Sequence, residues 1–234
     1  MSEFGPAYPK INSLWKRDPS NRNIIKPGEF ASEVFEALYD AEWEWTEKID
    51  GTNIRIYYDG YHVPTEAVIG GRTDNAQIPA DLYEALRPLT DGIRFCEVFG
   101  TSQSVNVTLY GEGYGPKIQK NGGGYRSDPG FILFDVRIGN TWLKREAVAD
   151  IAEKFGVPHV AVLDSCSLAS AWMNMVGGEY KSTFPEHELE GIVGRPKTRF
   201  YTNTGHGFSP VLAKIKYSDI DNYNRYTKGH VLQA

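Results

Sequence analysis

Cysteine is scarce in this chain, with Cys96 and Cys166 the only two among 234 residues. Neither is spaced from another cysteine or a histidine as a zinc ligand would be, and the five histidines show no ligand spacing. We therefore expect no disulfide framework and no structural zinc site, and we predict that both thiols are reduced packing residues.

Long apolar runs are also missing. No run approaches the roughly 20 residues that cross a bilayer, and the start, Met1 to Phe4, lacks the basic and then apolar form of a signal peptide. We expect a cytoplasmic protein without a membrane partner, acting in a host cytoplasm if it is phage-encoded.

A surplus of positive charge is absent too, because the formal net charge is -5. An acidic balance argues against a nucleic-acid partner, since phosphate binding normally needs a basic surface. Net charge is not local charge, however, and basic residues gather in four segments that could line one groove. Taken singly, each segment is more simply a solvated face. The segments are residues 10–22, 117–126, 195–199 and 214–228.

Strand patterns dominate the chain and helical patterns are interspersed among them, which indicates an α+β domain built on antiparallel strands. We find no linker or repeat, so residues 1–234 are expected to form a single domain, with an extended N-terminal arm over about residues 1–30 and no separate C-terminal domain. The predicted strands cover residues 43–49, 53–58, 61–63, 67–72, 106–112, 131–137, 160–163, 189–194 and 211–217. The predicted helices cover residues 27–39, 79–89, 144–155 and 168–176.

Lys48 lies between an apolar strand and the turn Gly51-Thr52. A lysine that is partly desolvated near other cations loses its proton more easily, as a nucleophilic amine must. Gly51 would let the backbone approach a phosphate. Alone, however, the motif Lys-x-Asp-Gly is more typical of a surface hairpin.

Two downstream segments reverse that interpretation. Glu190 interrupts an apolar strand, where a carboxylate needs a partner. A divalent metal ion is one such partner, and a salt bridge to Arg195 or Lys197 is the other. Lys214 and Lys216 alternate along a strand, so both side chains share one face and could reach one phosphate. An exposed edge strand carrying lysines is the alternative.

In this order, the segments resemble the covalent nucleotidyltransferases, the superfamily of ATP-dependent DNA ligases, RNA ligases and capping enzymes. The resemblance runs from residue 44 to 219, through the blocks KIDGTN, GGRTD, YGEGYGPKIQKNGG, FILFDV, ELEGIVGRP and LAKIKYSD. Asn53, where DNA ligases and capping enzymes carry arginine, is similar to the pattern of phage nick-sealing RNA ligases. The resemblance implies an antiparallel-sheet nucleotidyltransferase domain, of the ATP-grasp-like ligase adenylation type, with flanking helices.

The same resemblance implies roles for individual residues. Lys48 would accept AMP from ATP, Glu190 would hold Mg or Mn, and Lys214 and Lys216 would bind the α-phosphate. Nucleotide contacts are expected from Glu47, Arg72, Glu112 and Phe134, although Arg72 could instead contact an RNA 5′ phosphate. RNA contacts are expected from Asn53, Gln119 and Asp135. Glu97, in a competing acidic motif, is expected to be structural or superficial. The arm residues Trp15, Lys16 and Arg17 are similar to those of phage RNA ligases.

These expectations describe a monomeric ATP-dependent RNA ligase that joins a 5′ phosphate to a 3′ hydroxyl in nicked duplex or structured RNA. Two departures from the family pattern stand out. The first is Asp50, at a position where phage enzymes often have histidine. The second is that little chain follows Lys216, so we expect either that a helper protein replaces a C-terminal domain or that the ligase is minimal. The alternatives are a minimal DNA ligase, a capping guanylyltransferase, and a ligase-derived nucleotide or RNA binding module. Intact Lys48, Glu190, Lys214 and Lys216 argue against the binding module, which needs no nucleophile.

Overall fold

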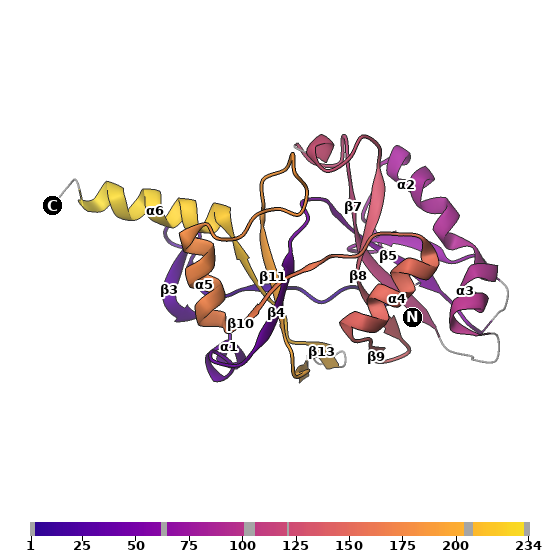
Figure 1. Cartoon of the computed structure of the whole chain (residues 1–234), viewed down its shortest axis with the longest axis horizontal. Coiled ribbons are helices and arrows are strands. Elements are labelled where there is room, and N and C mark those ends of the chain that lie inside the picture. Colours follow the sequence, from indigo (N-terminus) through magenta and orange to yellow (C-terminus); the bar gives the residue numbers. More distant parts are fainter. Residues whose placement is uncertain (1–2, 62–64, 101–105, 121, 204–207, 232–234) are drawn as a thin grey trace. The chain divides into compact units, whose positions relative to one another are not determined.

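The structure, a computed structural model, describes residues 3–61, 65–100, 106–120, 122–203 and 208–231. Contacts between residues divide the chain into two compact units (Figure 1). Unit 1 comprises Met1–Tyr8 and Asp50–Val160, and unit 2 comprises Pro9–Ile49 and Ala161–Ala234. Each unit is therefore assembled from separate stretches of the sequence. The expected single domain over residues 1–234 stays a prediction.

Unit 1 is built on a five-stranded antiparallel sheet in the order β6-β5-β7-β8-β9. The strands are β5 (Thr52–Tyr58), β6 (Val68–Gly71), β7 (Val107–Tyr114), β8 (Gly130–Ile138) and β9 (Thr141–Trp142). The helical segments are α2 (Ala80–Leu86), η1 (Arg87–Thr90), α3 (Gly92–Phe99), η2 (Gly122–Gly124) and α4 (Arg145–Phe155).

One face of this sheet carries the apolar core of unit 1. Ile54 and Ile56 alternate along β5 and are completely buried against helical residues such as Phe155. Helix α4 contributes Val148, Ile151, Ala152 and Phe155, spaced as one helical stripe. It ends at Gly156, whose φ of +66° is the left-handed conformation that glycine adopts most easily. The opposite face is left for polar and aromatic side chains.

Residues 4–8 lie against that opposite face. The hydroxyl of Tyr110 donates a hydrogen bond of 2.8 Å to the carbonyl of Pro6, and the ring of Tyr8 contacts those of Tyr110 and Trp142. A side chain at Gly5 would overlap the ring of Tyr57, with a Cβ only 2.3 Å from its Cδ2. The N-terminal segment therefore covers part of the sheet at close range.

Unit 2 contains a second five-stranded sheet, in the order β1-β14-β11-β4-β10, in which only the β1–β14 pair is parallel. Two hairpins, β2–β3 and β12–β13, accompany it. The strands are β1 (Asn12–Ser13), β2 (Trp15–Asp18), β3 (Ile24–Phe30), β4 (Trp43–Glu47), β10 (Val162–Cys166), β11 (Gly191–Pro196), β12 (Tyr201–Asn203), β13 (Phe208–Pro210) and β14 (Ala213–Lys216). The helices are α1 (Glu33–Ala37), α5 (Leu168–Gly177) and α6 (Tyr217–Val231).

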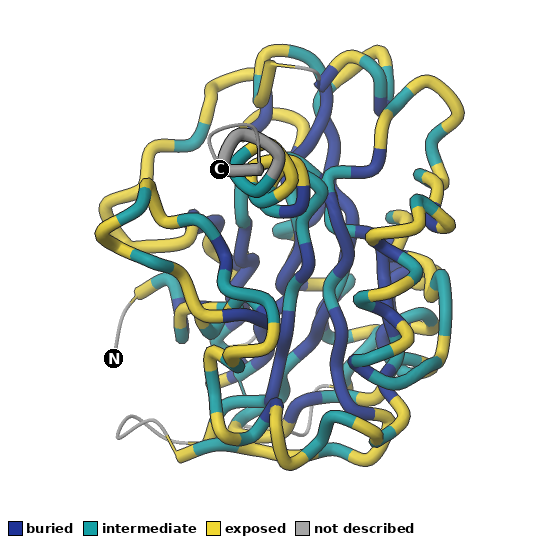
Figure 2. Tube along the Cα trace, turned by 90° about the vertical axis from the view of Figure 1, so that its left-hand side faces the viewer, coloured by how far each residue is buried: buried dark blue, intermediate teal, exposed yellow. Residues whose placement is uncertain are grey.

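Two stacked indoles anchor the core of unit 2. The rings of Trp43 and Trp45 lie 5.9 Å apart at 20°, and both side chains are completely buried. Their neighbours include Ile192 on β11 and Met175 on α5. In Figure 2 the long buried stretches lie in strands, and β4, β7 and β11 are among the strands that are mostly buried, while many connecting turns are exposed. In the described part of the chain, no helix has the length and apolar character needed to cross a membrane.

The predicted helix over residues 27–39 is wrong in its first half. Residues 24–30 form strand β3, and helix α1 begins only after Ser32, whose side chain accepts a hydrogen bond from the amide of Val34. Pro27 and Gly28 fall where the β2–β3 register shifts, so Pro27 has no paired residue and its missing N–H costs no ladder bond. Much of the expected extended arm is thus strand.

The sequence patterns also missed two helices. Helix α3 occupies the acidic segment around Glu97, and helix α6 follows Lys216 directly. Glu97 itself is exposed, as expected for a surface residue. The predicted strand over residues 61–63 lies largely outside the described residues.

We predict that Gly194→Ala destabilises unit 2. The new Cβ would lie 2.5 Å from the ring of Trp45, which is completely buried and cannot move aside. Overpacking of this kind costs about 1–3 kcal/mol in the free energy of unfolding, measurable by urea denaturation. Gly177→Ala is the matched control, because its nearest neighbour is 3.4 Å away and alanine favours the helix. Equal stability of the two variants would show that the contact between Gly194 and Trp45 is not restrictive.

Candidate active site

Three adjacent strands of unit 2 bring the predicted catalytic residues together, because Lys214 and Lys216 lie on β14, Lys48 follows β4 and Glu190 precedes β11. Ile192 faces Glu47 on β4 and Ile215 on β14, and these positions point to the core. Residues one position away point to the other face, so Lys214 and Lys216 share the face opposite the core, as the alternation predicts. Lys48 follows Glu47 immediately, and its amide donates to the carbonyl of Gly191 at 2.9 Å.

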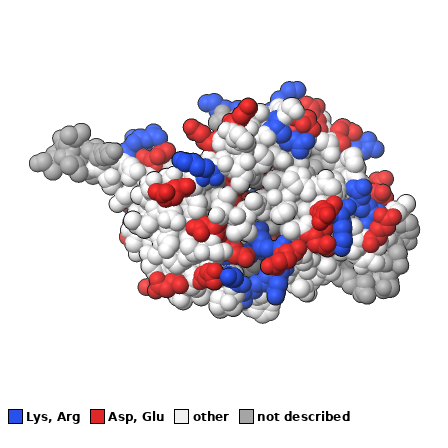
Figure 3. All heavy atoms as spheres, in the orientation of Figure 1, with Lys and Arg blue, Asp and Glu red and all other residues white. Residues whose placement is uncertain are grey.

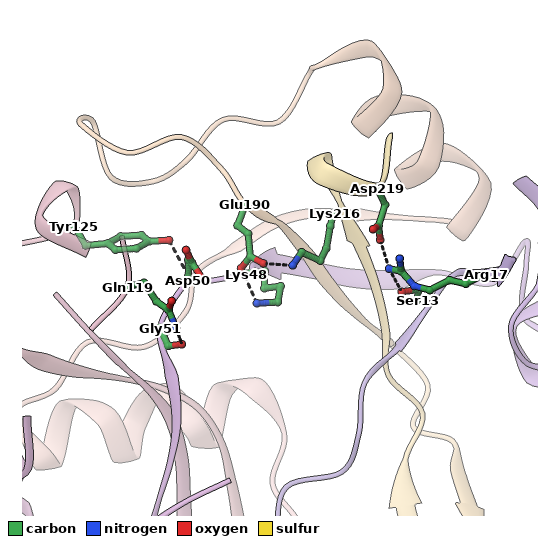
Figure 4. Close-up of polar contacts among 10 residues, drawn as sticks. All are labelled: Ser13, Arg17, Lys48, Asp50, Gly51, Gln119, Tyr125, Glu190, Lys216 and Asp219. Carbon is green, nitrogen blue, oxygen red and sulfur yellow. Dashed lines mark hydrogen bonds and ion pairs between the residues drawn. The ribbon is translucent and has the colours of Figure 1, made fainter. Parts of the chain in front are cut away.

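Through its carboxylate, Glu190 connects Lys48, which follows β4, with Lys216 on β14 (Figure 4). Its Oε2 accepts from Lys48 Nζ at 2.6 Å, and its Oε1 lies 2.6 Å from Lys216 Nζ. The alternative of a salt bridge to Lys197 or Arg195 is wrong. Lys197 pairs with Glu42 at 2.9 Å, and Arg195 stands opposite Glu44, several residues further along β11.

Lys214 completes a cationic cluster with Lys48 and Lys216. The pKa of the Lys214 ammonium is lowered below its ordinary value, first because the group is half-buried and second because positive charges surround it. Among the described residues, no hydrogen bond or ion pair satisfies its Nζ. Two of the three ammonium groups, those of Lys48 and Lys216, thus share a single bridging carboxylate, and the remaining excess of positive charge suits a phosphate.

Gly191 allows the two strands that carry these groups to approach. A Cβ at this position would lie 2.3 Å from the carbonyl oxygen of Ile215 on β14. Glu190 and Lys216 come together because no side chain separates the backbones at that point.

Glu47, expected to contact the nucleotide, uses its side chain in another way. The carboxylate is 2 % exposed and accepts three hydrogen bonds: Ser182 Oγ at 2.6 Å, Thr183 Oγ1 at 2.6 Å and the Thr183 amide at 2.8 Å. It therefore ties the segment before Glu190 to the strand before Lys48. A nucleotide contact made by this residue would have to come from its backbone.

Arg17 was singled out only by resemblance, and the structure gives it definite partners. One guanidinium nitrogen lies 2.6 Å from a carboxylate oxygen of Asp219 and donates to Ser13 Oγ at 3.0 Å. Ser13 faces Lys214 across the parallel β1–β14 pair. Trp15 has a structural position, buried against Phe30 and Trp172.

The remaining predicted residues belong to unit 1. Asn53 and Glu112 are opposite one another on β5 and β7. The Oδ1 of Asn53 is buried and has no hydrogen-bond partner among the described residues, which is unusual for a buried polar atom and suits a donor from a ligand. The position of Glu112 also shows why residue 51 is a glycine. A Cβ at Gly51 would lie 2.7 Å from the Glu112 Cγ and 2.3 Å from the Gly113 carbonyl oxygen.

The turn after Lys48 is held from two sides in unit 1. Gln119 Nε2 donates to the carbonyl of Gly51 at 2.9 Å, and the amide of Asp50 donates to the hydroxyl of Tyr125 at 2.8 Å (Figure 4). Tyr125 was missed by the sequence analysis. No signal in the chain distinguishes it from the other tyrosines, because its role depends on a contact between distant residues.

Phe134 and Asp135 lie at an irregularity of β8. The register with β7 shifts so that Tyr110 faces Asp135 and Gly111 faces Leu133, leaving Phe134 as the extra residue of a bulge. Asp135 is completely buried and accepts a hydrogen bond of 3.0 Å from Tyr8, whose ring also meets that of Phe134 at 4.8 Å. Direct contact between Asp135 and RNA would therefore require Tyr8 to move.

The four basic segments are divided between the units. Residues 117–126 belong to unit 1, and the other three segments belong to unit 2. Figure 3 shows acidic and basic side chains interspersed on the face displayed. Local clusters such as the lysines around Glu190 are thus the relevant positive features.

A divalent metal ion fits this site only together with phosphate. In the part of the chain that the structure describes, no three histidine, cysteine, aspartate or glutamate side chains gather to hold a metal ion. Magnesium and similar ions are commonly held by one carboxylate together with waters and substrate phosphate oxygens. Glu190 would supply that carboxylate, and the ammonium groups of its neighbours Lys48 and Lys216 would suit the phosphates.

Comparison with known proteins places this geometry in context. The profile of the family described as RNA ligase matches residues 41–216. No curated protein matches. Solved structures similar to this chain include a mutant Naegleria gruberi RNA ligase with ATP and Mn, at 17% identity and a TM-score of 0.56 over 94% of this chain and 63% of that one.

Two further structures are similar to the same extent. Another Naegleria gruberi RNA ligase mutant, with AMP and Mn, shares 18% identity at a TM-score of 0.57, over 93% of this chain and 64% of that one. A putative ATP-dependent DNA ligase from Aquifex aeolicus shares 16% identity at a TM-score of 0.56, over 92% of this chain and 50% of that one. This chain thus spans less than two thirds of each of these proteins. The likeness confirms the predicted α+β nucleotidyltransferase fold.

We predict that Glu47→Gln destabilises the protein by about 1–3 kcal/mol, because an amide has one acceptor oxygen and leaves some of the three donors around this buried side chain unsatisfied. Chemical denaturation measures the change. The exposed Glu186→Gln provides the control and should alter the free energy of unfolding by no more than about 0.5 kcal/mol. A Glu47 variant as stable as this control would contradict the anchoring role.

Proposed function

Because the chain belongs to the RNA ligase family, we propose that it is an ATP-dependent RNA ligase that acts through a lysyl-AMP intermediate on Lys48. The observation that carries the proposal is the Glu190 carboxylate, which bridges Lys48 and Lys216 beside the half-buried Lys214. A nucleophilic amine, an acidic partner and cations for phosphate are the groups that this chemistry requires.

In the first step, Lys48 Nζ attacks the α-phosphorus of ATP. A P–N bond forms, the bond to the pyrophosphate oxygen breaks, and the proton that Lys48 loses passes to solvent. Glu190 Oε2, at 2.6 Å, accepts a hydrogen bond from the amine and orients it. Lys214 and Lys216 bind oxygens of the α-phosphate, where charge accumulates as pyrophosphate departs. A Mg or Mn ion held by Glu190 and the phosphates would add further charge neutralisation.

In the second step, an RNA 5′ phosphate oxygen attacks the lysyl-AMP phosphorus. The P–N bond breaks, and the adenylate is transferred to the RNA end. In the third step, a 3′ hydroxyl attacks the RNA 5′ phosphorus, a phosphodiester forms and AMP leaves. Each step depends on positioning and electrostatics rather than on a further covalent group. The substrate is a nick in duplex or structured RNA.

The unit 1 residues supply recognition in this proposal. Glu112 binds the ribose hydroxyls, Phe134 stacks on adenine, and Arg72 contacts a phosphate of the nucleotide or of the RNA 5′ end. The buried Oδ1 of Asn53, which has no partner in the described part of the chain, supports a polar contact to substrate. Gln119 contributes near the RNA 3′ end, and Asp135 acts indirectly, through Tyr8.

A minimal DNA ligase is the second candidate. It is favoured by Asp50, which gives the Lys-x-Asp-Gly form of those enzymes, and disfavoured by Asn53. The two candidates differ in the sugar that they require at the 3′ end of a nick.

We expect Lys48→Ala and Lys48→Arg to abolish transfer of labelled AMP from ATP to the protein, since neither retains a nucleophilic amine. Protein-bound label after denaturing electrophoresis measures the transfer, and labelled GTP should give none. Lys154→Ala, at an exposed lysine of α4 that pairs with Asp150, should label as the wild type does. Labelling of a Lys48 variant at the wild-type level would rule out this nucleophile.

We expect sealing of a 5′-phosphorylated nick to require a ribonucleotide at the 3′ hydroxyl end, with ATP and Mg or Mn present. Product length on a denaturing gel measures joining, and omission of the metal should reduce it to background. Equal joining of all-DNA nicks would instead favour the DNA ligase. Lysyl-AMP formation without joining would contradict an autonomous ligase.

A further inference from the structure

Arg55 is a charged residue in an unusual position. It lies on β5 in unit 1, and its side chain is 1 % exposed. Burial of a guanidinium is costly unless its donors are satisfied, and an apolar residue of similar size is often as stable at such a position. The chemistry proposed above gives Arg55 no role, so its burial calls for another explanation.

The guanidinium makes hydrogen bonds in three directions. Its Nε donates to the carbonyl of Gly71 at 2.9 Å, and Nη1 donates to the carbonyl of Gly5 at 2.7 Å. Nη2 forms an ion pair with Asp74, whose side chain is half exposed. Arg55 therefore holds the end of β6, the turn that follows it, and the N-terminal segment.

The turn held in this way carries Arg72. Arg72 is exposed and stands between two of the anchors, the Gly71 carbonyl before it and the Asp74 carboxylate after it. The turn is also closed on itself, because the amide of Ala76 donates to the carbonyl of Thr73 at 3.0 Å. A Cβ at Gly71 would lie 2.7 Å from that of Ala76, so the turn packs directly on the strand end.

We propose that Arg55 is a positioning residue for Arg72. The inference rests on the proposed function, in which Arg72 contacts a phosphate of the nucleotide or of the RNA 5′ end. A long arginine side chain delivers its charge accurately only if its backbone is held, and small displacements of such groups reduce rates strongly. The planar fork of Arg55 binds two acceptors on either side of Arg72 at once. A lysine has a single flexible ammonium and cannot replace this geometry.

The experiment is a double-mutant cycle between Arg55→Lys and Arg72→Ala, read out as single-turnover sealing of a 5′-phosphorylated RNA nick. We expect Arg55→Lys to lower the sealing rate about tenfold or more. Arg72→Ala should lower it at least as far, and the double variant should seal within about twofold of Arg72→Ala alone, because Arg55 acts through Arg72. Rate losses that multiply in the double variant would overturn the proposal.

Loss of folding is separated from loss of positioning by two further variants. Arg94→Met removes another partly buried arginine of unit 1, which donates to the Phe155 carbonyl at 3.1 Å, and should affect stability without affecting sealing per folded molecule. Asp74→Ala acts at the half-exposed end of the ion pair and should lower sealing in the same direction as Arg55→Lys. If Arg55→Lys and Asp74→Ala lowered stability only, as Arg94→Met does, the positioning role would be lost.

Failure of the proposed function has a different signature. A wild-type protein that neither labels with ATP nor seals nicks would remove the ligase proposal, and this inference with it. A wild type that does both, combined with multiplicative losses in the cycle, would remove the inference about Arg55 alone.

Discussion

The candidate chemistry of unit 2 depends on one carboxylate that neutralises two ammonium groups on separate strands. Glu190 comes directly before β11, which lies between β4 and β14 in the sheet, and from there its carboxylate reaches both Lys48 and Lys216. Without it, mutually repelling cations would face one another in a partly buried site. With it, the cluster keeps an excess of positive charge and a defined geometry, as a phosphate-binding site requires.

Two buried charges support candidate residues in a similar way. Glu47 binds Ser182 and Thr183 in the segment before Glu190, and Arg55 binds Gly71 and Asp74 around Arg72. Each is nearly inaccessible to solvent and each is satisfied by hydrogen bonds. Polar anchors of this kind fix loops more specifically than apolar packing does, because their donors and acceptors must meet in one arrangement.

The N-terminal segment adds a third such support within unit 1. Tyr8 combines a hydrogen bond to the buried Asp135 with ring contacts to Phe134 and Tyr110. Because of the bulge on β8, Phe134 has no paired residue on β7, whereas Leu133 and Asp135 on either side of it are paired. Asp135, which was expected to contact RNA, thus helps to hold an aromatic cluster. Phe134, which is proposed to stack on adenine, is part of that cluster.

The sequence by itself determined the α+β class, most strands, helices α4 and α5, and the sharing of one face by Lys214 and Lys216, because these follow from periodicity along a continuous stretch. It did not determine where the N-terminal arm ends or where α1 begins. Proline is common at the start of a helix, so Pro27 predicts a helix start unless the irregular pairing of β2 and β3 is known. Only the tertiary structure decided that Glu190 pairs with Lys48 and Lys216 rather than Lys197, and that Glu47, Arg55 and Tyr125 hold turns. Those contacts join residues far apart in the chain, and strand order and register, which local pattern does not encode, bring them together.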